Sequence, residues 1–120
     1  MKLPINPVIK VGDLIFSGGI APLDENGMIA GKFDAVIQTR EIFRRIEQYL
    51  YKIGMTLDNL VFVTVYLSDI KLYDQMNSVY GLVITEPYPA RKVVQTPLTL
   101  EGMVVEMTFI ASMHKKEVIK

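Results

Sequence analysis

The stretch NLVFVTVYLS, residues 59–68, decides how this sequence folds. Two sets of side chains alternate along it: Val61, Val63, Val65 and Leu67 on one side, and Phe62, Thr64 and Tyr66 on the other. A period of two is typical of a β-strand, and β-branched and aromatic residues favour that conformation. Because both sides are largely apolar, we expect residues 59–68 to form a central strand that is covered on both faces.

Helical patterns lie on both sides of this strand. Before it, apolar residues recur at three- and four-residue spacing from about residue 35 to residue 53. Asp34 is placed to cap the start of this helix, and Gly54 to end it. A second helix is expected from about Asp69 to residue 84, because the prolines at 87 and 89 exclude its continuation.

The outer segments predict short strands. Residues 8–11 and 14–17 flank a Gly12-Asp13 turn, which is a common hairpin signal. Further strands are expected over residues 28–32, 91–96 and 103–113. The order predicts one α+β domain over residues 1–120, with a mixed six-stranded sheet and two helices on one face. The other face would be bare, so we expect a neighbouring subunit to cover it.

Composition excludes several classes of function. Lysine plus arginine equals aspartate plus glutamate, 13 against 13, so no net charge attracts nucleic acid or an anionic membrane. The chain has no cysteine and no cluster with metal-ligand spacing, so we predict no metal and no cofactor. No apolar run approaches the roughly 20 residues that span a bilayer, and the N-terminus has no signal-peptide pattern. We expect a cytoplasmic protein.

Two charged residues are candidates for chemistry. Arg91 follows Pro89 and Ala90 at the start of a strand, and a guanidinium matches a carboxylate with two parallel hydrogen bonds. Glu106 lies within an otherwise apolar strand, where an ionised carboxylate is costly unless it has a partner. A surface arginine and an edge-facing glutamate are the alternatives. If the fold brings the two together, they form a site for a small anion and a water.

Four motifs carry a resemblance to a known family. They are residues 11–20 (VGDLIFSGGI), 77–80 (NSVY), 89–91 (PAR) and 105–111 (VEMTFIA). In this order and at this spacing, they resemble the motifs of the YjgF-type reactive intermediate deaminase (RidA) family. The match covers nearly the whole chain.

The resemblance implies a chorismate-mutase-like fold of the bacillus type and a homotrimer whose sheets line a central barrel. It implies sites between subunits, where enamines and imines such as 2-iminopropanoate and 2-iminobutanoate are hydrolysed to 2-oxo acids and ammonia. By the same resemblance, Arg91 would bind the substrate carboxylate with the backbone N–H of Val93, and Glu106 would position the attacking water. Ser17 and Gly18 would line the pocket, and Asn77 would support it.

The sequence departs from the family at some positions. Ile5 stands where the family has a tyrosine, and Gly19 where glutamine is usual. The alternative to an enzyme is therefore a non-catalytic trimeric module that binds 2-oxo acids or other small carboxylates. A chorismate mutase, suggested by fold analogy alone, is disfavoured because the sequence offers no cluster of cations for a dicarboxylate.

Overall fold

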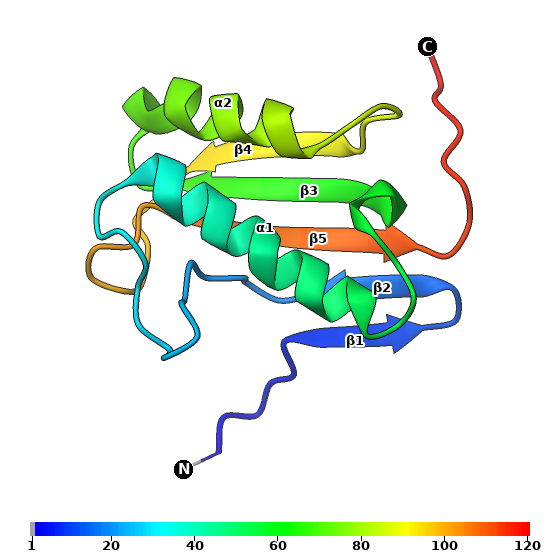
Figure 1. Ribbon diagram of the computed structural model, residues 1–120, viewed down its shortest axis with the longest axis horizontal. Helices are drawn as coiled ribbons and strands as arrows, with labels where there is room; N and C mark the ends of the chain where they lie inside the picture. The colour runs from blue at the N-terminus through cyan, green and yellow to red at the C-terminus, as the bar shows by residue number, and fades with distance from the viewer. Residues whose placement is uncertain (1) are drawn as a thin grey trace.

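The central strand of the computed structural model, which describes residues 2–120, is β3 (Leu60–Leu67). It lies in a five-stranded sheet with the order β1-β2-β5-β3-β4 (Figure 1). The other strands are β1 (Val8–Val11), β2 (Leu14–Ser17), β4 (Ala90–Gln95) and β5 (Val105–Ser112). The long helices are α1 (Ala35–Tyr51) and α2 (Tyr73–Val83). A short 3-10 helix, Leu57–Asn59, follows α1, and another, Ile70–Leu72, directly precedes α2.

The pairing of the strands makes the sheet mixed. Strand β3 runs parallel to β4 and antiparallel to β5, and the two hairpin strands β1 and β2 extend the sheet beyond β5. The parallel pair is joined by α2, as a crossover connection requires. Strand β4 is therefore an edge strand, which bears on the position of Arg91.

Helix α1 is bounded by the two residues that the sequence predicts, Asp34 at its start and Gly54 after its end. The Asp34 carboxylate accepts a hydrogen bond of 3.0 Å from the N–H of Ile37, which satisfies a free donor of the first turn. At the other end Gly54 adopts a φ of 73°, and the N–H of Met55 donates to the carbonyl of Leu50 at 2.9 Å. This return to the last turn is a Schellman motif, and it stops the helix two residues before the predicted end.

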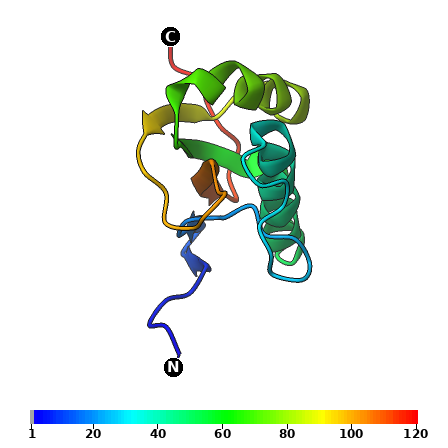
Figure 2. The same cartoon turned by 90° about the vertical axis from the view of Figure 1, so that its left-hand side faces the viewer.

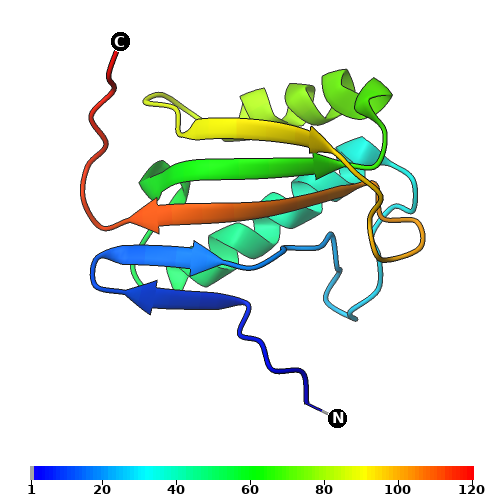
Figure 3. The same ribbon diagram turned by 180° about the vertical axis from the view of Figure 1, so that it is seen from behind.

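Both helices lie on one face of the sheet, as Figure 2 shows, and the view from behind shows the other face without a helix (Figure 3). Val63, Val65 and Leu67 are fully buried beneath the helices. The register places a row of apolar residues across all five strands on the bare face: Ile9, Phe16, Ile110, Phe62 and Ala90. Phe62 is 37% exposed there, although it belongs to the central strand. The predicted bare face is confirmed.

The predicted strand over residues 28–32 is wrong, so the sheet has five strands rather than six. The segment makes only an isolated bridge between Leu23 and Ile29, and the N–H of Ala30 donates to the carbonyl of Pro22. Gly27, Gly31 and Phe33 all adopt positive φ values. Three left-handed residues within seven interrupt an extended conformation, so the segment folds back on residues 22–24 instead of joining the sheet.

Candidate active site

Arg91 is the second residue of β4, and its side chain lies on the helix-covered face of the sheet. Its register partner is the fully buried Val63. One terminal nitrogen, Nη1, donates to Asn77 Oδ1 at 2.6 Å, and Nη2 donates to the Tyr73 hydroxyl at 2.7 Å. These bonds engage two of the five guanidinium N–H groups, and the other three have no hydrogen-bond partner among residues 2–120.

The partners of Arg91 come from one face of α2. Tyr73, Asn77 and Tyr80 are spaced four and three residues apart, which puts them on adjacent turns of the same helix side. The guanidinium carbon of Arg91 lies 4.6 Å from the centroid of the Tyr80 ring, a cation–π contact. We call these four residues the arginine group. Sequence reasoning found Arg91 and Asn77 but missed both tyrosines, although the helical spacing from Asn77 could have indicated them.

Tyr80 closes the inner side of the arginine group. Its hydroxyl is buried and has no hydrogen-bond partner among residues 2–120. Burial raises the pKa of the Tyr80 hydroxyl, and the positive charge of Arg91 partly opposes that rise. The phenol therefore stays neutral and serves as a wall beneath the guanidinium.

Val93 lies two residues beyond Arg91 on the same edge strand. The N–H of Thr96 donates to the carbonyl of Leu67 in β3 at 2.9 Å. Because successive N–H groups of a strand point to opposite sides, this bond directs the N–H groups of residues 92 and 94 toward β3 and that of Val93 away from it. The Val93 N–H therefore faces the open edge, on the strand that carries Arg91.

Glu106 is the second residue of β5 and lies on the bare face, opposite Tyr66 of β3. Its carboxylate makes no hydrogen bond and no ion pair with any residue in the 2–120 range. Burial raises the pKa of the Glu106 carboxyl above its ordinary value. An unpaired carboxylate that holds its proton more tightly than an ordinary glutamate does is suited to accept and return a proton.

Strand β2 leads into a turn whose Gly19 lies against Glu106. The Ser17 hydroxyl accepts a hydrogen bond of 2.7 Å from the N–H of Phe109, and the N–H of Gly18 donates to the carbonyl of Pro7 at 2.9 Å. Gly19 lies against the Glu106 carboxylate, so close that a Cβ there would fall 2.8 Å from Oε2. We call Ser17, Gly18, Gly19 and Glu106 the glutamate group.

Ile5 lies near this group. It is 69% exposed. A shallow hollow of about 290 Å³ is lined by Ile5, Asn6, Ile9, Phe16, Ser17 and Gly18. The side chain of Ile5 thus contributes an apolar wall next to Ser17 and Gly18.

Within one chain the fold does not bring Arg91 and Glu106 together. Strand β3 separates β4 from β5, so the two strands are roughly 10 Å apart. Moreover, Arg91 lies on the helix-covered face and Glu106 on the bare face. The chain therefore presents two half-sites, one cationic and one anionic.

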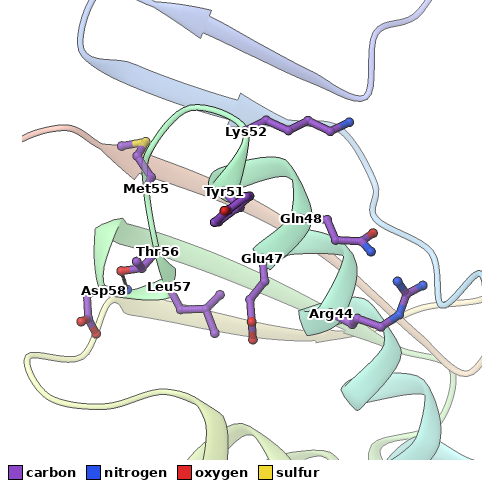
Figure 4. Close-up of a pocket in the computed structure, with 9 residues that line it drawn as sticks. All are labelled: Arg44, Glu47, Gln48, Tyr51, Lys52, Met55, Thr56, Leu57 and Asp58. Atoms are coloured by element: carbon purple, nitrogen blue, oxygen red, sulfur yellow. Dashed lines mark hydrogen bonds between the residues drawn. The ribbon is translucent and has the colours of Figure 1, made fainter.

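A separate groove lies beside the end of α1 (Figure 4). It measures about 830 Å³ and contains none of the predicted site residues. Its lining includes Arg44 and Lys52 as well as Glu47 and Asp58, so no single charge sign dominates.

The described residues contain no group of three or more His, Cys, Asp or Glu side chains that could hold a metal ion. No helix among them is long and apolar enough to cross a membrane.

Comparisons with known proteins agree on one family. The family model described as Endoribonuclease L-PSP matches residues 3–113. A RutC family protein of Pyrococcus abyssi is 38% identical over 109 residues, which cover 90% of this chain and 85% of that protein. The 3-aminoacrylate deaminase RutC of Acinetobacter baylyi is 32% identical over 108 residues, which cover 90% of this chain and 86% of that protein.

The fold agrees with solved structures of the same family. The crystal structure of RidA from the Antarctic bacterium Psychrobacter sp. PAMC 21119 superimposes with a TM-score of 0.85 at 28% identity. The match covers 92% of this chain and 89% of that one. With a family model over nearly all of the sequence and relatives above 30% identity, the resemblance of the motifs is confirmed: the chain belongs to the YjgF/RidA family, which includes the RutC proteins.

Proposed function

We propose that this protein is a cofactor-independent hydrolytic deaminase of enamines and imines of small 2-oxo acids, acting at sites between the subunits of a homotrimer. The observation that carries the proposal is the pair of half-sites, because each supplies what the other lacks. A held guanidinium suits the substrate carboxylate, and an unpaired carboxylate with a raised pKa suits a water. A cytoplasmic location stays a prediction.

The arginine group would anchor the substrate. A 2-imino acid carries a carboxylate next to its reactive carbon, and the N–H groups that Arg91 has left can bind that carboxylate. Asn77 and Tyr73 hold the guanidinium before the substrate arrives, so little freedom is lost on binding. The outward N–H of Val93 would add a donor to the same carboxylate.

The glutamate group would handle the water. As the water oxygen forms a bond to the imine carbon, the π electrons move to nitrogen, and Glu106 accepts the proton that the water loses. The same carboxyl then gives that proton to the nitrogen of the tetrahedral intermediate. Glu106 next takes the proton of the intermediate's hydroxyl group and passes it to the same nitrogen, so the carbon–nitrogen bond breaks, ammonia leaves, and the carbonyl of the 2-oxo acid forms. An oriented water and a proton acceptor suffice for this reaction.

A trimer would join the two half-sites. The bare face carries an apolar row over all five strands, and an exposed apolar surface of this extent is typical of an interface. Packing the bare faces around a central axis would cover the row and bring the β4 edge of one chain toward the glutamate group of the next. We expect the particle to sediment at three times the chain mass of 13.6 kDa.

The substrate class rests on chemistry and on a relative. We expect 2-iminopropanoate and 2-iminobutanoate, and the relative named 3-aminoacrylate deaminase makes 3-aminoacrylate a further compound to test. The family model's description names a ribonuclease, but a chain with 13 positive and 13 negative residues offers RNA little general attraction. The deaminase reaction is therefore preferred over cleavage of RNA.

One observation favours the second candidate, a non-catalytic trimeric module that binds a small carboxylate. Ile5 offers no hydroxyl beside Ser17 and Gly18, so its side chain cannot donate a hydrogen bond to a substrate or a water. The arginine group would still bind a 2-oxo acid in such a protein. The enzyme is preferred because an unpaired, half-buried carboxylate is costly to keep for binding alone.

A coupled assay tests the enzyme directly. A serine dehydratase generates 2-aminoacrylate, which tautomerises to 2-iminopropanoate, and its decay is followed with and without this protein. We expect faster decay, and we expect Arg91→Ala to lose most of the effect. Arg40→Ala, which changes an exposed arginine of α1, is the matched control and should keep the wild-type rate. If the wild-type protein does not accelerate decay while it binds 2-oxo acids, the module replaces the enzyme.

A further inference from the structure

Tyr66 lies directly opposite Glu106 on the bare face of the sheet. The two residues are register partners on β3 and β5, which lie side by side in the view of Figure 3. Met107 uses both its N–H and its carbonyl for hydrogen bonds with Ile20, at 3.2 Å and 2.7 Å, so the backbone groups of Glu106 point toward β3. Tyr66 and Glu106 are therefore a hydrogen-bonded strand pair, with Cα atoms about 5.5 Å apart and side chains on one face.

The Tyr66 hydroxyl is available to a ligand. It makes no hydrogen bond with residues 2–120 and is not buried, whereas the Tyr80 hydroxyl, which also has no partner, is buried. The Glu106 carboxylate bends toward Gly19, on the side of β5 that faces away from β3. No bond joins the phenol and the carboxylate directly. Because the phenol O–H donates and the carboxylate accepts, one water can bridge them.

The neighbouring row of the bare face is polar as well. Thr64 and Thr108 are register partners one row from Tyr66 and Glu106, and Lys92 of β4 lies beside Thr64. Neither threonine hydroxyl is buried without a partner. Lys92 is the one other charged side chain that the described strands place on this face. A patch of this kind within an apolar interface keeps its hydrogen bonds only where water or a ligand remains with it.

We propose that the Tyr66 hydroxyl holds the attacking water together with Glu106, as a further catalytic residue of the same chain. This inference rests on the proposed deaminase function. The phenol donates to the water oxygen, and the water donates to the Glu106 carboxylate, so one lone pair of that oxygen is left to attack the imine carbon. Tyr66 keeps its own proton throughout, and the proton that the water loses goes to Glu106. Two contacts orient the water, where Glu106 alone would supply one.

The first test is Tyr66→Phe in the coupled deaminase assay, which removes the hydroxyl and keeps the ring. We expect kcat to fall about tenfold, as the loss of one hydrogen bond in the transition state predicts. KM should change less than about threefold, because the arginine group is untouched. Tyr51→Phe, which removes an exposed hydroxyl from α1, is the matched control and should keep the wild-type kcat. Equal kcat values for the two variants overturn the proposal.

A double substitution tests whether Tyr66 and Glu106 act on the same water. Glu106→Asp keeps the acid but withdraws its carboxylate by one methylene, so a water can no longer contact both groups. Tyr66→Phe should therefore cost less than about twofold in kcat in the Glu106→Asp background. The full tenfold loss in that background would overturn a shared water.

A second readout does not depend on activity. With ¹³C at the ring Cζ of every tyrosine, the Tyr66 signal is assigned by its loss in Tyr66→Phe, and its shift is followed over pH. The signal should respond to the ionisation of Glu106, with a midpoint above that of an ordinary glutamate, because burial raises the pKa of this carboxyl. The response should be absent in Glu106→Gln. A Tyr66 signal that does not respond in the wild type, or still responds in Glu106→Gln, overturns the proposal.

These readouts separate failure of the inference from failure of the proposed function. If the wild-type protein does not accelerate the decay of 2-aminoacrylate, the deaminase function fails, and the ¹³C titration alone decides whether Tyr66 and Glu106 share a water. If the wild-type protein is active while Tyr66→Phe keeps the full kcat, the deaminase stands and the role of Tyr66 is overturned.

Discussion

Arg91 and Glu106 are held in different ways, and the difference suits different tasks. Two hydrogen bonds and the ring of Tyr80 fix the guanidinium of Arg91 before any ligand binds. The Glu106 carboxylate rests on the backbone of Gly19 without a hydrogen bond or a cation from residues 2–120. A fixed cation is what an anion anchor needs, and a carboxylate with a raised pKa is what a proton acceptor needs.

The raised pKa of Glu106 predicts how stability changes with pH. Burial makes the folded protein bind the Glu106 proton more tightly than the unfolded chain does. This residue therefore favours folding most below the ordinary glutamate pKa, and that contribution is lost as the pH rises through the raised value. Relative to the wild type, Glu106→Gln should gain stability as the pH is raised from about 3 to about 8.

Urea unfolding of both proteins at several pH values, at one fixed protein concentration, measures this gain. Glu47→Gln, at an exposed position of α1, controls for the loss of a negative charge. A stability difference between wild type and Glu106→Gln that stays constant over the range, or declines with pH, would contradict the burial of the carboxyl.

Tyr73 gives a second prediction at a single residue. Its hydroxyl accepts the hydrogen bond of Arg91 Nη2, and Tyr73→Phe removes that bond while keeping the ring. We expect KM for the carboxylate substrate to rise roughly tenfold, because a hydrogen bond to a charged group contributes about 1.5 kcal/mol, with a smaller change in kcat. Tyr51→Phe is the control, since Tyr51 is 83% exposed on α1. An equal KM for Tyr73→Phe and Tyr51→Phe would contradict a role of the Tyr73 hydroxyl in substrate binding.

Sequence reasoning found the charged residues of the site but not their surroundings. Glu106 stands out because an ionised carboxylate in an apolar strand is costly without a partner. Arg91 stands out because a guanidinium just after the rigid Pro89 is suited to bind an anion. Tyr73 and Tyr80 were missed because a tyrosine on the apolar stripe of a helix has the same pattern as a core residue. Only the register of β4 under α2 brings these rings to the guanidinium.

At the scale of elements, Gln38 of α1 forms hydrogen bonds with the loops that contain Gly31 and Gly102 and with the start of β5. It is fully buried, and its Nε2 donates to the carbonyls of Gly31 and Gly102 at 3.1 Å and 2.7 Å. Its Oε1 accepts from the N–H groups of Val104 and Val105 at 2.7 Å and 3.2 Å. One side chain thus satisfies backbone groups at the start of β5, directly before Glu106.

Gln38→Leu should therefore destabilise the protein strongly. Leucine has a similar volume but leaves the buried N–H groups of Val104 and Val105 without their side-chain acceptor, at a cost of about 2–5 kcal/mol. Urea unfolding at fixed protein concentration measures the loss. Gln48→Leu makes the same change at an exposed position of the same helix and should cost well under half as much. Equal losses would show that the four hydrogen bonds contribute little.

The elements themselves were largely predictable. The alternation of side chains located β3, because that pattern acts within a few residues. Likewise, the capping residue Asp34 at one end and Gly54 at the other located α1. The segment 28–32 has apolar residues but no partner strand, and two glycines and Phe33 turn its backbone instead. Whether such a segment joins a sheet depends on contacts far away in the chain, which a local pattern does not contain.

At the scale of the whole molecule, the opposite faces of Arg91 and Glu106 are the decisive fact. The sequence indicated a bare face, and the sheet order explains why a single chain cannot close a site around the two charges. A trimer arranged around the bare faces would place the arginine group of one subunit next to the glutamate group of another. Each site would then need two chains.

Mixing two inactive variants tests whether the sites are shared. Arg91→Ala keeps the glutamate group, and Glu106→Gln keeps the arginine group, so each pure protein should be inactive in the deaminase assay. After the two are unfolded together and refolded at equal amounts, about a quarter of the sites should combine an intact Arg91 with an intact Glu106. Activity should thus return to about a quarter of the wild-type level. A mixture that stays inactive, although wild type refolded alone recovers, would mean that both residues of a site come from one chain or that no shared site forms.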